Sequence, residues 1–299
     1  MIDGLQHGYI QVNGIRMHYV AAGEGPPLLL LHGFPEFWYS WRHQIAALSR
    51  HFTVIAPDMR GYNETDKPNW GYEVDVLVSD MIELLHRFGY ERAIVVGHDW
   101  GGAIAWALAI TYPHRVERLI VLNCPHPALF TQALRSNPRQ MLRSLYFGLF
   151  QLPWLPEALI RANDYALIDQ IFRGQSIRKD AFSAEDIEMF KDAISKPGAL
   201  TAALNWYRAV GRGGGLSLRR GVENRIETPT LLIWGEEDQA LGKELTYNTD
   251  QFVSNLQVRY IPQCSHWVQQ EQPELVNRYI IEFLDDLIEK ERLIASDDQ

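Results

Sequence analysis

Short apolar runs alternate with longer amphipathic stretches along most of this chain, and few folds accommodate that alternation. The apolar runs occupy residues 26–33, 52–58, 92–99, 118–125, 229–238 and 258–262. Each is nearly continuous in apolar residues, as is typical of strands buried on both faces of a parallel sheet. The intervening stretches, such as VLVSDMIELLHRFG at residues 76–89, have helical spacing. The pattern predicts an α/β protein with a doubly wound, mostly parallel sheet.

Two segments depart from this rhythm. At residues 9–20, YIQVNGIRMHYV has two alternating stretches joined by Asn13-Gly14, which is a strong signal for a β-hairpin. Residues 128–221 contain no convincing strand and hold helix-like segments with the aromatic-rich stretch RSLYFGLFQLPWLPE. We therefore predict a core made of residues 1–127 and 222–299, with residues 128–221 inserted as a helical cap.

The cap also contains the glycine-rich stretch GRGGG at residues 211–215. A phosphate-binding loop would follow a strand and continue into Lys-Ser or Lys-Thr, and both features are missing here. The stretch therefore predicts a flexible loop.

Composition narrows the class of protein. The 299 residues are 46% apolar and 22% charged, which is ordinary for a soluble globular enzyme. The net charge is -9, and no cluster of lysine and arginine is evident, so we expect no nucleic-acid partner. The two cysteines, Cys124 and Cys264, have the spacing of neither a disulfide framework nor a metal site. We expect reduced thiols, and neither a metal nor a cofactor.

The N-terminal residues MIDGLQHGYIQVNG lack the basic and apolar segments of a signal peptide. No apolar run approaches the roughly 18 residues of a membrane-spanning helix. We therefore expect a cytoplasmic protein with no membrane span, and the sequence leaves both a monomer and a homodimer open.

Polar residues follow the predicted strands. In open α/β sheets, ligands bind beyond the carboxyl ends of the strands, so these positions are the candidates for a site. They are His32-Gly33-Phe34-Pro35, Asp58, His98-Asp99-Trp100, Asn123-Cys124, Glu236-Glu237-Asp238 and Cys264-Ser265-His266. The set contains a nucleophile, an acid and a base.

The stretch GHDWG, residues 97–101, has the pattern of a hydrolase nucleophile elbow with Asp99 where Ser is usual. A carboxylate is ionised at neutral pH and attacks without a base, but it is a weak nucleophile. Its attack on an ester would give an uphill anhydride, whereas displacement at a tetrahedral carbon gives a stable alkyl ester. Asp99 therefore points to an epoxide or an alkyl halide as the electrophile, rather than to a helix-capping role.

The second step needs a base that activates water. His266 follows the last predicted strand and Asp238 the preceding one, which is the nucleophile–acid–base order of a hydrolase triad. Asp238 would orient the imidazole and stabilise its charged form; Glu236 and Glu237 are its neighbours and rivals. The backbone N–H groups of Phe34 and Trp100 are candidates for an oxyanion hole.

The segments LLLLHGFPEFWYSWRHQ, GYNETDKP, VVGHDWGG, LNWYR and CSHW together resemble the epoxide hydrolases of the α/β-hydrolase superfamily, over nearly the whole chain. The resemblance implies an α/β-hydrolase fold and a hydrophobic epoxide and water as substrates. It makes HGFP the oxyanion loop, with His32 and Pro35 in supporting positions. It also favours Asp238 over Glu236 and Glu237 as the acid of the triad.

The resemblance also implies two cap tyrosines that hold and protonate the epoxide oxygen. Tyr207 in LNWYR fits one of them, and Tyr146 fits the other, with Tyr165 as its rival. Four tryptophans are either core residues or substrate contacts: Trp38, Trp41, Trp206 and Trp267. Of these we place Trp38 with the substrate-binding residues.

Two alternative functions stay open. A haloalkane or haloacid dehalogenase uses the same aspartate nucleophile. Haloalkane dehalogenases tend to have Asn or Trp donors for the halide; Phe34 stands where such an Asn would be, although Trp100 could serve as a donor. Fluoroacetate dehalogenases have arginines where Trp100 and Ala103 stand. The other alternative is a hydrolase fold that only binds a small molecule, which the intact set of nucleophile, acid, base and tyrosines disfavours.

Overall fold

The computed structural model describes residues 4–215 and 225–297. Its centre is an eight-stranded sheet with the order β1-β2-β4-β3-β5-β6-β7-β8. The strands are β1 (Gln6–Val12), β2 (Ile15–Ala22), β3 (Pro27–Leu31), β4 (Thr53–Pro57), β5 (Ala93–His98), β6 (Val116–Leu122), β7 (Thr230–Gly235) and β8 (Leu256–Ile261). The pairs β1–β2 and β2–β4 are antiparallel and the others parallel. The predicted hairpin and the mostly parallel sheet are both confirmed.

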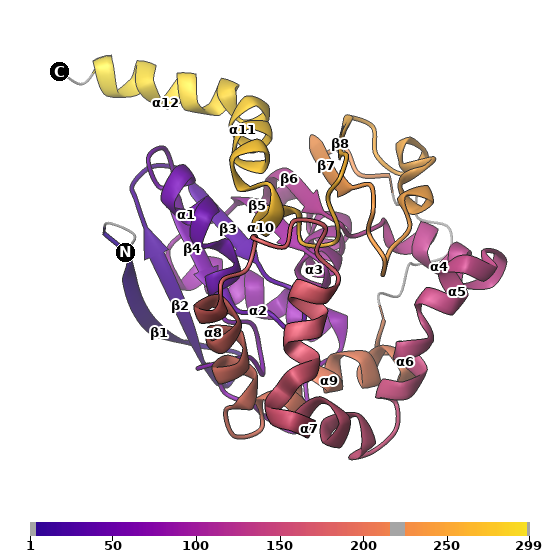
Figure 1. Ribbon diagram of the computed structural model, residues 1–299. Coiled ribbons are helices and arrows are strands. Elements are labelled where there is room, and N and C mark those ends of the chain that lie inside the picture. The colour runs from indigo at the N-terminus through magenta and orange to yellow at the C-terminus, as the bar shows by residue number, and fades with distance from the viewer. Residues whose placement is uncertain (1–3, 216–224, 298–299) are drawn as a thin grey trace.

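Helices cover both faces of this sheet (Figure 1). They are α1 (Arg42–Leu48), α2 (Val74–Arg87), α3 (Trp100–Thr111), α10 (Val268–Glu271) and α11 (Pro273–Phe283), with short 3-10 turns η1 (Trp38–Trp41), η2 (Pro113–Arg115), η5 (Lys243–Thr246) and η6 (Thr249–Gln251). The C-terminal helix α12 (Asp285–Asp297) follows α11 and extends beyond the sheet (Figure 1). Successive strand residues point to opposite faces. Leu29 and Leu31 accordingly pack in the cluster that contains α2 and α3, while Leu28 and Leu30 pack with α1 and α11.

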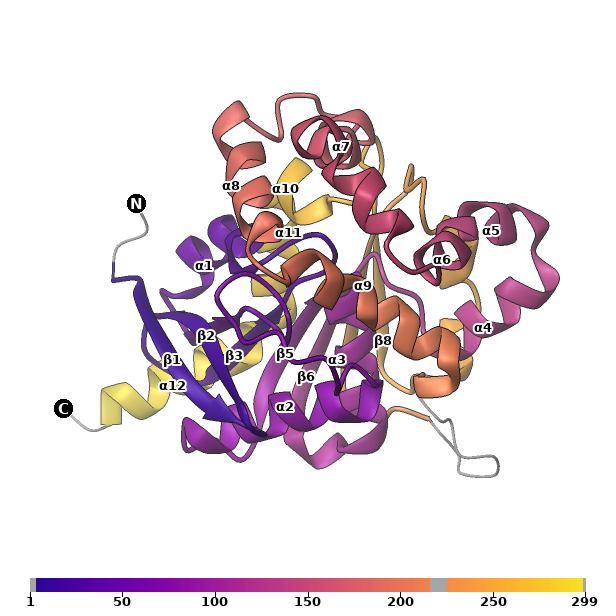
Figure 2. The ribbon, with the colours of Figure 1, turned by 90° about the horizontal axis from the view of Figure 1, so that it is seen from below.

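Between β6 and β7 the described residues form helices and turns but no strand, as predicted. They are α4 (Pro127–Ser136), α5 (Pro138–Arg143), α6 (Leu145–Phe150), α7 (Leu155–Asp169), η3 (Gln170–Gly174), α8 (Ala184–Ser195), α9 (Ala199–Ala209) and η4 (Val210–Gly214). Figures 1 and 2 show α4–α6 at the edge of the molecule far from β1. Helix α9 lies against the core, since the Trp206 indole is buried and donates to the Arg60 carbonyl at 3.1 Å.

The glycine-rich stretch departs from its prediction. Residues 210–214 continue α9 as a single π-helical turn rather than forming a loop, with Gly213 at a φ of 92°. A helix already begun upstream extends into this stretch, and glycine tolerates the positive φ on which the turn ends.

Candidate active site

Asp99 stands at a sharp bend between β5 and α3. Its φ of 51° and ψ of -119° are rare for a residue with a side chain. The bend brings backbone segments so close that a Cβ atom on Gly97 would overlap Gly101, and one on Gly101 would overlap Leu31. The glycines of GHDWG are therefore required by close approach, and the strand-to-helix elbow predicted from that stretch is present.

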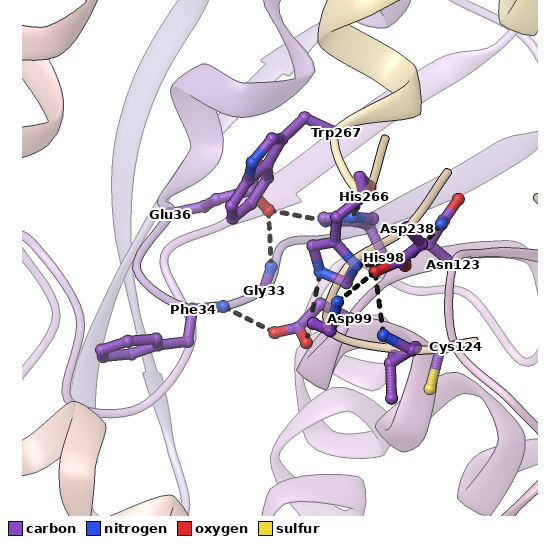
Figure 3. Close-up of polar contacts among 12 residues, drawn as sticks. Gly33, Phe34, Glu36, His98, Asp99, Asn123, Cys124, Asp238, His266 and Trp267 are labelled. Atoms are coloured by element: carbon purple, nitrogen blue, oxygen red, sulfur yellow. Dashed lines mark hydrogen bonds and ion pairs between the residues drawn. The ribbon is translucent and has the colours of Figure 1, made fainter. Parts of the chain in front are cut away.

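The structure brings Asp99, His266 and Asp238 together from three loops at the carboxyl edge of the sheet (Figure 3). Nε2 of His266 lies 3.6 Å from Oδ2 of Asp99, and Nδ1 lies 2.7 Å from Oδ2 of Asp238. The ring thus faces one carboxylate with each nitrogen. In this arrangement Asp238 can orient the imidazole through Nδ1, while Nε2 points toward Asp99.

Asp238 is the acid that contacts His266, and its carboxylate is buried. Oδ1 accepts the backbone N–H groups of Ala240 and Leu241 at 2.8 and 2.9 Å. The Asn123 amide donates to Oδ2 at 2.7 Å. The two rival glutamates have other partners: Glu236 pairs with Lys243, and Glu237 accepts the backbone N–H of Cys264 at 3.0 Å.

The charges of this group stabilise one another. Burial opposes ionisation of Asp99, but His266, His98 and the Phe34 N–H outweigh it and lower the Asp99 pKa. Burial likewise opposes protonation of His266, but the carboxylates of Asp238 and Asp99 outweigh it and raise the His266 pKa well above 6.5. Both shifts favour an ionised Asp99 beside a protonated His266.

The loop after β3 supplies an N–H group to Asp99. Phe34 donates its backbone N–H to Oδ1 of Asp99 at 2.8 Å, and the Phe34–Pro35 peptide bond is cis. Trp100 begins α3, so its N–H is among the first of that helix, which have no partner within the helix. His32 braces the loop: Nδ1 bonds to the Gly33 carbonyl at 2.9 Å, and Nε2 accepts the Met59 N–H at 3.0 Å.

Beneath these groups His98 forms a buried pair with Glu36, a residue that was not among the candidates from the sequence. Glu36 accepts bonds from the Gly33 N–H at 3.0 Å, from His98 at 2.8 Å and from the Gln269 amide at 3.0 Å. Nε2 of His98 in turn donates to the His266 carbonyl at 2.9 Å. The pair thus links the oxyanion loop, the elbow and the His266 loop. The available signal was a glutamate directly after HGFP.

An apolar cavity of about 200 Å³ opens above Asp99. Its lining residues come from both the core and the helical insertion: Val74, Asp99, Trp100, Ala103, Cys124, Pro125, Pro127, Phe130, Thr131, Tyr146, Phe147, Tyr207, Val210, Gly215 and Leu241. Both predicted tyrosines line this cavity, with ring centroids 5.9 Å apart. Tyr165 is not among its lining residues.

The two tyrosines keep their protons. Burial raises the pKa of Tyr146 and of Tyr207 well above 10, and the Asp99 carboxylate adds to this effect. Tyr207 packs edge-on against Phe34 and Trp100, with ring centroids 5.4 and 5.0 Å away. Each phenol is therefore a hydrogen-bond donor in an apolar wall.

The four tryptophans that the sequence left open do not line the cavity. Trp38 contacts His7 and Phe37 and is not among the residues that line the cavity, so the structure separates it from the site at which we expected it. Trp41, Trp206 and Trp267 are buried core residues. Among the described residues, no group of three or more His, Cys, Asp or Glu side chains is placed to hold a metal ion, and no helix is long and apolar enough to cross a membrane.

The chain is similar to known proteins of one fold family. The family model described as the alpha/beta hydrolase fold matches residues 26–273. The chain is 45% identical over 288 residues to the AB hydrolase superfamily protein YfhM of Bacillus subtilis, covering 95% of this chain and 99% of that protein. It is 43% identical to Epoxide hydrolase 4 of Homo sapiens, covering 93% of this chain and 78% of the relative.

The solved structures that resemble this chain include epoxide hydrolases, as the relatives found by sequence do. A crystal structure of Bacillus megaterium epoxide hydrolase in complex with an inhibitor superposes with a TM-score of 0.87 at 33% identity, covering 93% of this chain and 100% of that one. The epoxide hydrolase VrEH1 from Vigna radiata gives a TM-score of 0.83 at 29% identity, covering 96% and 99%.

Proposed function

The chain belongs to the epoxide hydrolases of the α/β-hydrolase fold, and we propose that it converts a hydrophobic epoxide to a vicinal diol through a covalent ester on Asp99. One observation carries the proposal. The Asp99 carboxylate lies on the wall of an apolar cavity that two protonated tyrosines share. A nucleophile and two acids are thus available to opposite ends of one carbon–oxygen bond.

In the first step, an oxygen of Asp99 attacks a ring carbon and the carbon–oxygen bond of the epoxide breaks. The departing alkoxide is a strong base, so it takes a proton from Tyr146 or Tyr207. Their burial suits this task, because an apolar wall keeps both phenols protonated until the alkoxide forms. The product is an alkyl ester on Asp99 and a tyrosinate.

In the second step, water attacks the carbonyl carbon of the ester. Nε2 of His266 takes the proton of the water, and Asp238 stabilises the imidazolium. The N–H groups of Phe34 and Trp100 would hold the oxyanion of the tetrahedral intermediate, and the Phe34 N–H already donates to Asp99. The intermediate collapses to the Asp99 carboxylate and the diol, whose departing oxygen takes the remaining proton of the attacking water, and the imidazolium is the form of His266 that the resting carboxylates favour.

Alkylation also prepares the base. In the resting site the charge of Asp99 favours protonated His266. An ester carries no charge, so its formation removes this effect and lowers the His266 pKa. The imidazolium can then give its proton to the tyrosinate, and the neutral imidazole can activate water, which explains how a histidine paired with two carboxylates serves as a base.

The insertion between β6 and β7 is proposed as the cap of this enzyme, over residues 128–221. It supplies both tyrosines and much of the apolar wall, which supports a substrate-binding role. Its proposed C-terminal boundary at residues 221 and 222 lies outside the described residues.

A single-turnover experiment tests the covalent route. Enzyme in excess over an aromatic epoxide such as styrene oxide is mixed in water enriched in heavy oxygen, and the diol is analysed by mass spectrometry. The proposal predicts that the diol of this single turnover carries no label, because its new oxygen comes from Asp99, whereas substrate in excess should give labelled diol from later turnovers. Label in the first diol would exclude the ester, and turnover of haloalkanes but of no epoxide would favour a dehalogenase.

A further inference from the structure

The outer surface of the helical insertion carries exposed apolar side chains in an unusual concentration. Within residues 141–154 they are Met141, Leu142, Leu145, Leu149, Leu152 and Trp154, which we call the outer cap face. Leu142, Leu145 and Trp154 expose 68%, 65% and 74% of their surface. Contiguous apolar patches on a soluble protein mark interaction sites more often than isolated apolar residues do.

Helix α6 is apolar on both sides. Tyr146 and Phe147 line the cavity, and Phe150 is buried against Tyr207. Leu145 and Leu149 are one helical turn apart, so they share a face, and both are exposed. Packing within the chain accounts for the first face and leaves the second without a partner among the described residues.

The charge of this region is opposite to that of the whole chain. Residues 127–162 contain Arg135, Arg139, Arg143 and Arg161 but only one acid, Glu157, whereas the whole chain has a net charge of -9. Both carboxylate oxygens of Glu157 bond to Arg208, at 2.8 and 3.0 Å. The region therefore presents a positive surface on an acidic protein.

Three arginines of this region, Arg135, Arg139 and Arg161, are exposed, and so is Arg212 near the end of the insertion. None of the four forms an ion pair with another described residue, so each is available to an external anion. Arg161 and Arg212 line a hollow beside Trp154, together with the polar side chains of Thr201 and Asn205. The hollow offers guanidinium and hydrogen-bonding groups next to an exposed indole.

We propose that the outer cap face docks on the surface of a bilayer that contains anionic phospholipids. Exposed leucine and tryptophan side chains bind at the boundary of headgroups and acyl chains, and neighbouring arginines bind the lipid phosphates. The short helices α5 and α6 would lie on the membrane rather than cross it. Helix α6 also carries Tyr146, so the proposed active site would lie directly behind the docked surface. The catalytic meaning of this arrangement rests on the proposed function, whereas the docking itself does not.

The charge pattern favours a membrane over a second copy of this chain. In a two-fold dimer the same surface meets itself, so an interface through this face would bring arginines toward arginines. Like charges facing each other across an interface oppose association. An anionic lipid surface compensates those charges instead.

Vesicle flotation of the purified full chain tests the docking. Phosphatidylcholine vesicles with and without phosphatidylglycerol are compared at low and high salt, with size-exclusion chromatography of the lipid-free protein alongside. The wild-type chain should float with the anionic vesicles, and high salt should weaken the binding. Because each basic residue near such a surface contributes about 1 kcal/mol, Arg135→Gln/Arg139→Gln should bind roughly 10- to 30-fold more weakly.

Leu142→Gln/Leu145→Gln should also bind at least roughly 10-fold more weakly, since two apolar side chains no longer enter the interface. Ile177→Gln and Arg50→Gln, at exposed positions outside the outer cap face, are the matched controls and should bind as the wild type does. All variants are checked for an unchanged thermal unfolding midpoint. Absence of flotation, equal binding by all variants, or a dimer that only the leucine variant dissociates would overturn the proposal.

Discussion

Nε2 of His266 lies 3.6 Å from Oδ2 of Asp99, while Nδ1 of the same ring is held 2.7 Å from Oδ2 of Asp238. The two carboxylates act on one imidazole, but only Asp99 loses its charge during the proposed reaction. The protonation of His266 therefore depends on whether Asp99 is free or esterified. The His266 pKa and the pH dependence of stability should therefore both change when the charge of Asp99 is removed.

Replacement of Asp99 by Asn imitates the uncharged ester, so it should lower the pKa of His266 below its wild-type value. NMR titration of imidazole resonances measures this pKa directly. Asp238→Asn should also lower it, because that carboxylate is the larger source of the increase. An unchanged His266 pKa in Asp99→Asn would mean that alkylation does not switch the base.

The same pair predicts how stability depends on pH. The His266 pKa is raised on folding, so its contribution is full below its ordinary value of 6.5 and is lost as pH rises through the folded-state pKa. Asp99→Asn removes one source of that increase. Its unfolding free energy should therefore differ most from that of the wild type on the acidic side of this transition, while the Asp99 carboxylate stays ionised, and the difference should shrink at higher pH. Urea unfolding at several pH values measures it.

Loss of either cap tyrosine should slow ester formation more than ester hydrolysis, because only the first step produces an alkoxide. Tyr207→Phe and Tyr146→Phe should each reduce the alkylation rate by roughly 10²-fold or more, the usual range for loss of a general acid. Stopped-flow measurement of alkylation under single-turnover conditions separates the two steps. Tyr165→Phe is the matched control, and an equal loss in that variant would contradict the roles given to Tyr146 and Tyr207.

Asp238→Asn should slow ester hydrolysis much more than ester formation, which is the reverse of the tyrosine variants. Ester hydrolysis should fall by roughly 10³–10⁴-fold, as for triads that lose their acid, while alkylation by Asp99 should be affected much less. Glu236→Gln, at the neighbouring carboxylate that pairs with Lys243, should leave hydrolysis nearly unchanged. A variant in which alkylation falls as far as hydrolysis would show that Asp238 serves the nucleophile instead.

Glu36→Ala should destabilise the fold by about 3–5 kcal/mol, the usual cost of removing one partner of a buried ion pair. The loop after β3, the end of β5 and helix α10 lose a shared partner at once, since Glu36 bonds to Gly33, His98 and Gln269. Urea unfolding measures the change, with Glu91→Ala at an exposed position as the control. A loss below about 1 kcal/mol would show that these three segments hold their places without Glu36.

Much of the site follows from the sequence because strand ends in a parallel sheet meet at one edge. The residues after β5, β7 and β8 could be listed from their apolar runs alone, and the structure brings Asp99, Asp238 and His266 into contact. The choice among Glu236, Glu237 and Asp238 depended on resemblance. The structure distinguishes the three carboxylates by their partners, because only Asp238 contacts His266, whereas Glu236 pairs with Lys243 and Glu237 with the Cys264 N–H.

Contacts that depend on packing between distant loops could not be predicted in this way. Glu36 and Asn123 act through partners that are distant in sequence, and neither carries a periodic signal. Trp38 adjoins the oxyanion loop in sequence, yet its ring packs against His7. The prediction of a loop at residues 211–215 was wrong because the preceding helix extends into this stretch as one turn that ends at Gly214. Local composition did not report these tertiary contacts.

Intact-protein mass spectrometry of His266→Gln tests the central claim most directly. Without the base the ester should accumulate on mixing with an epoxide, and the protein mass should rise by the full mass of that epoxide, mapped by peptide digestion to Asp99. The wild-type chain should show no lasting adduct, and Asp99→Ala/His266→Gln should show none at all. Absence of any epoxide adduct on a folded His266→Gln chain, or an adduct at a residue other than Asp99, would contradict the proposed nucleophile.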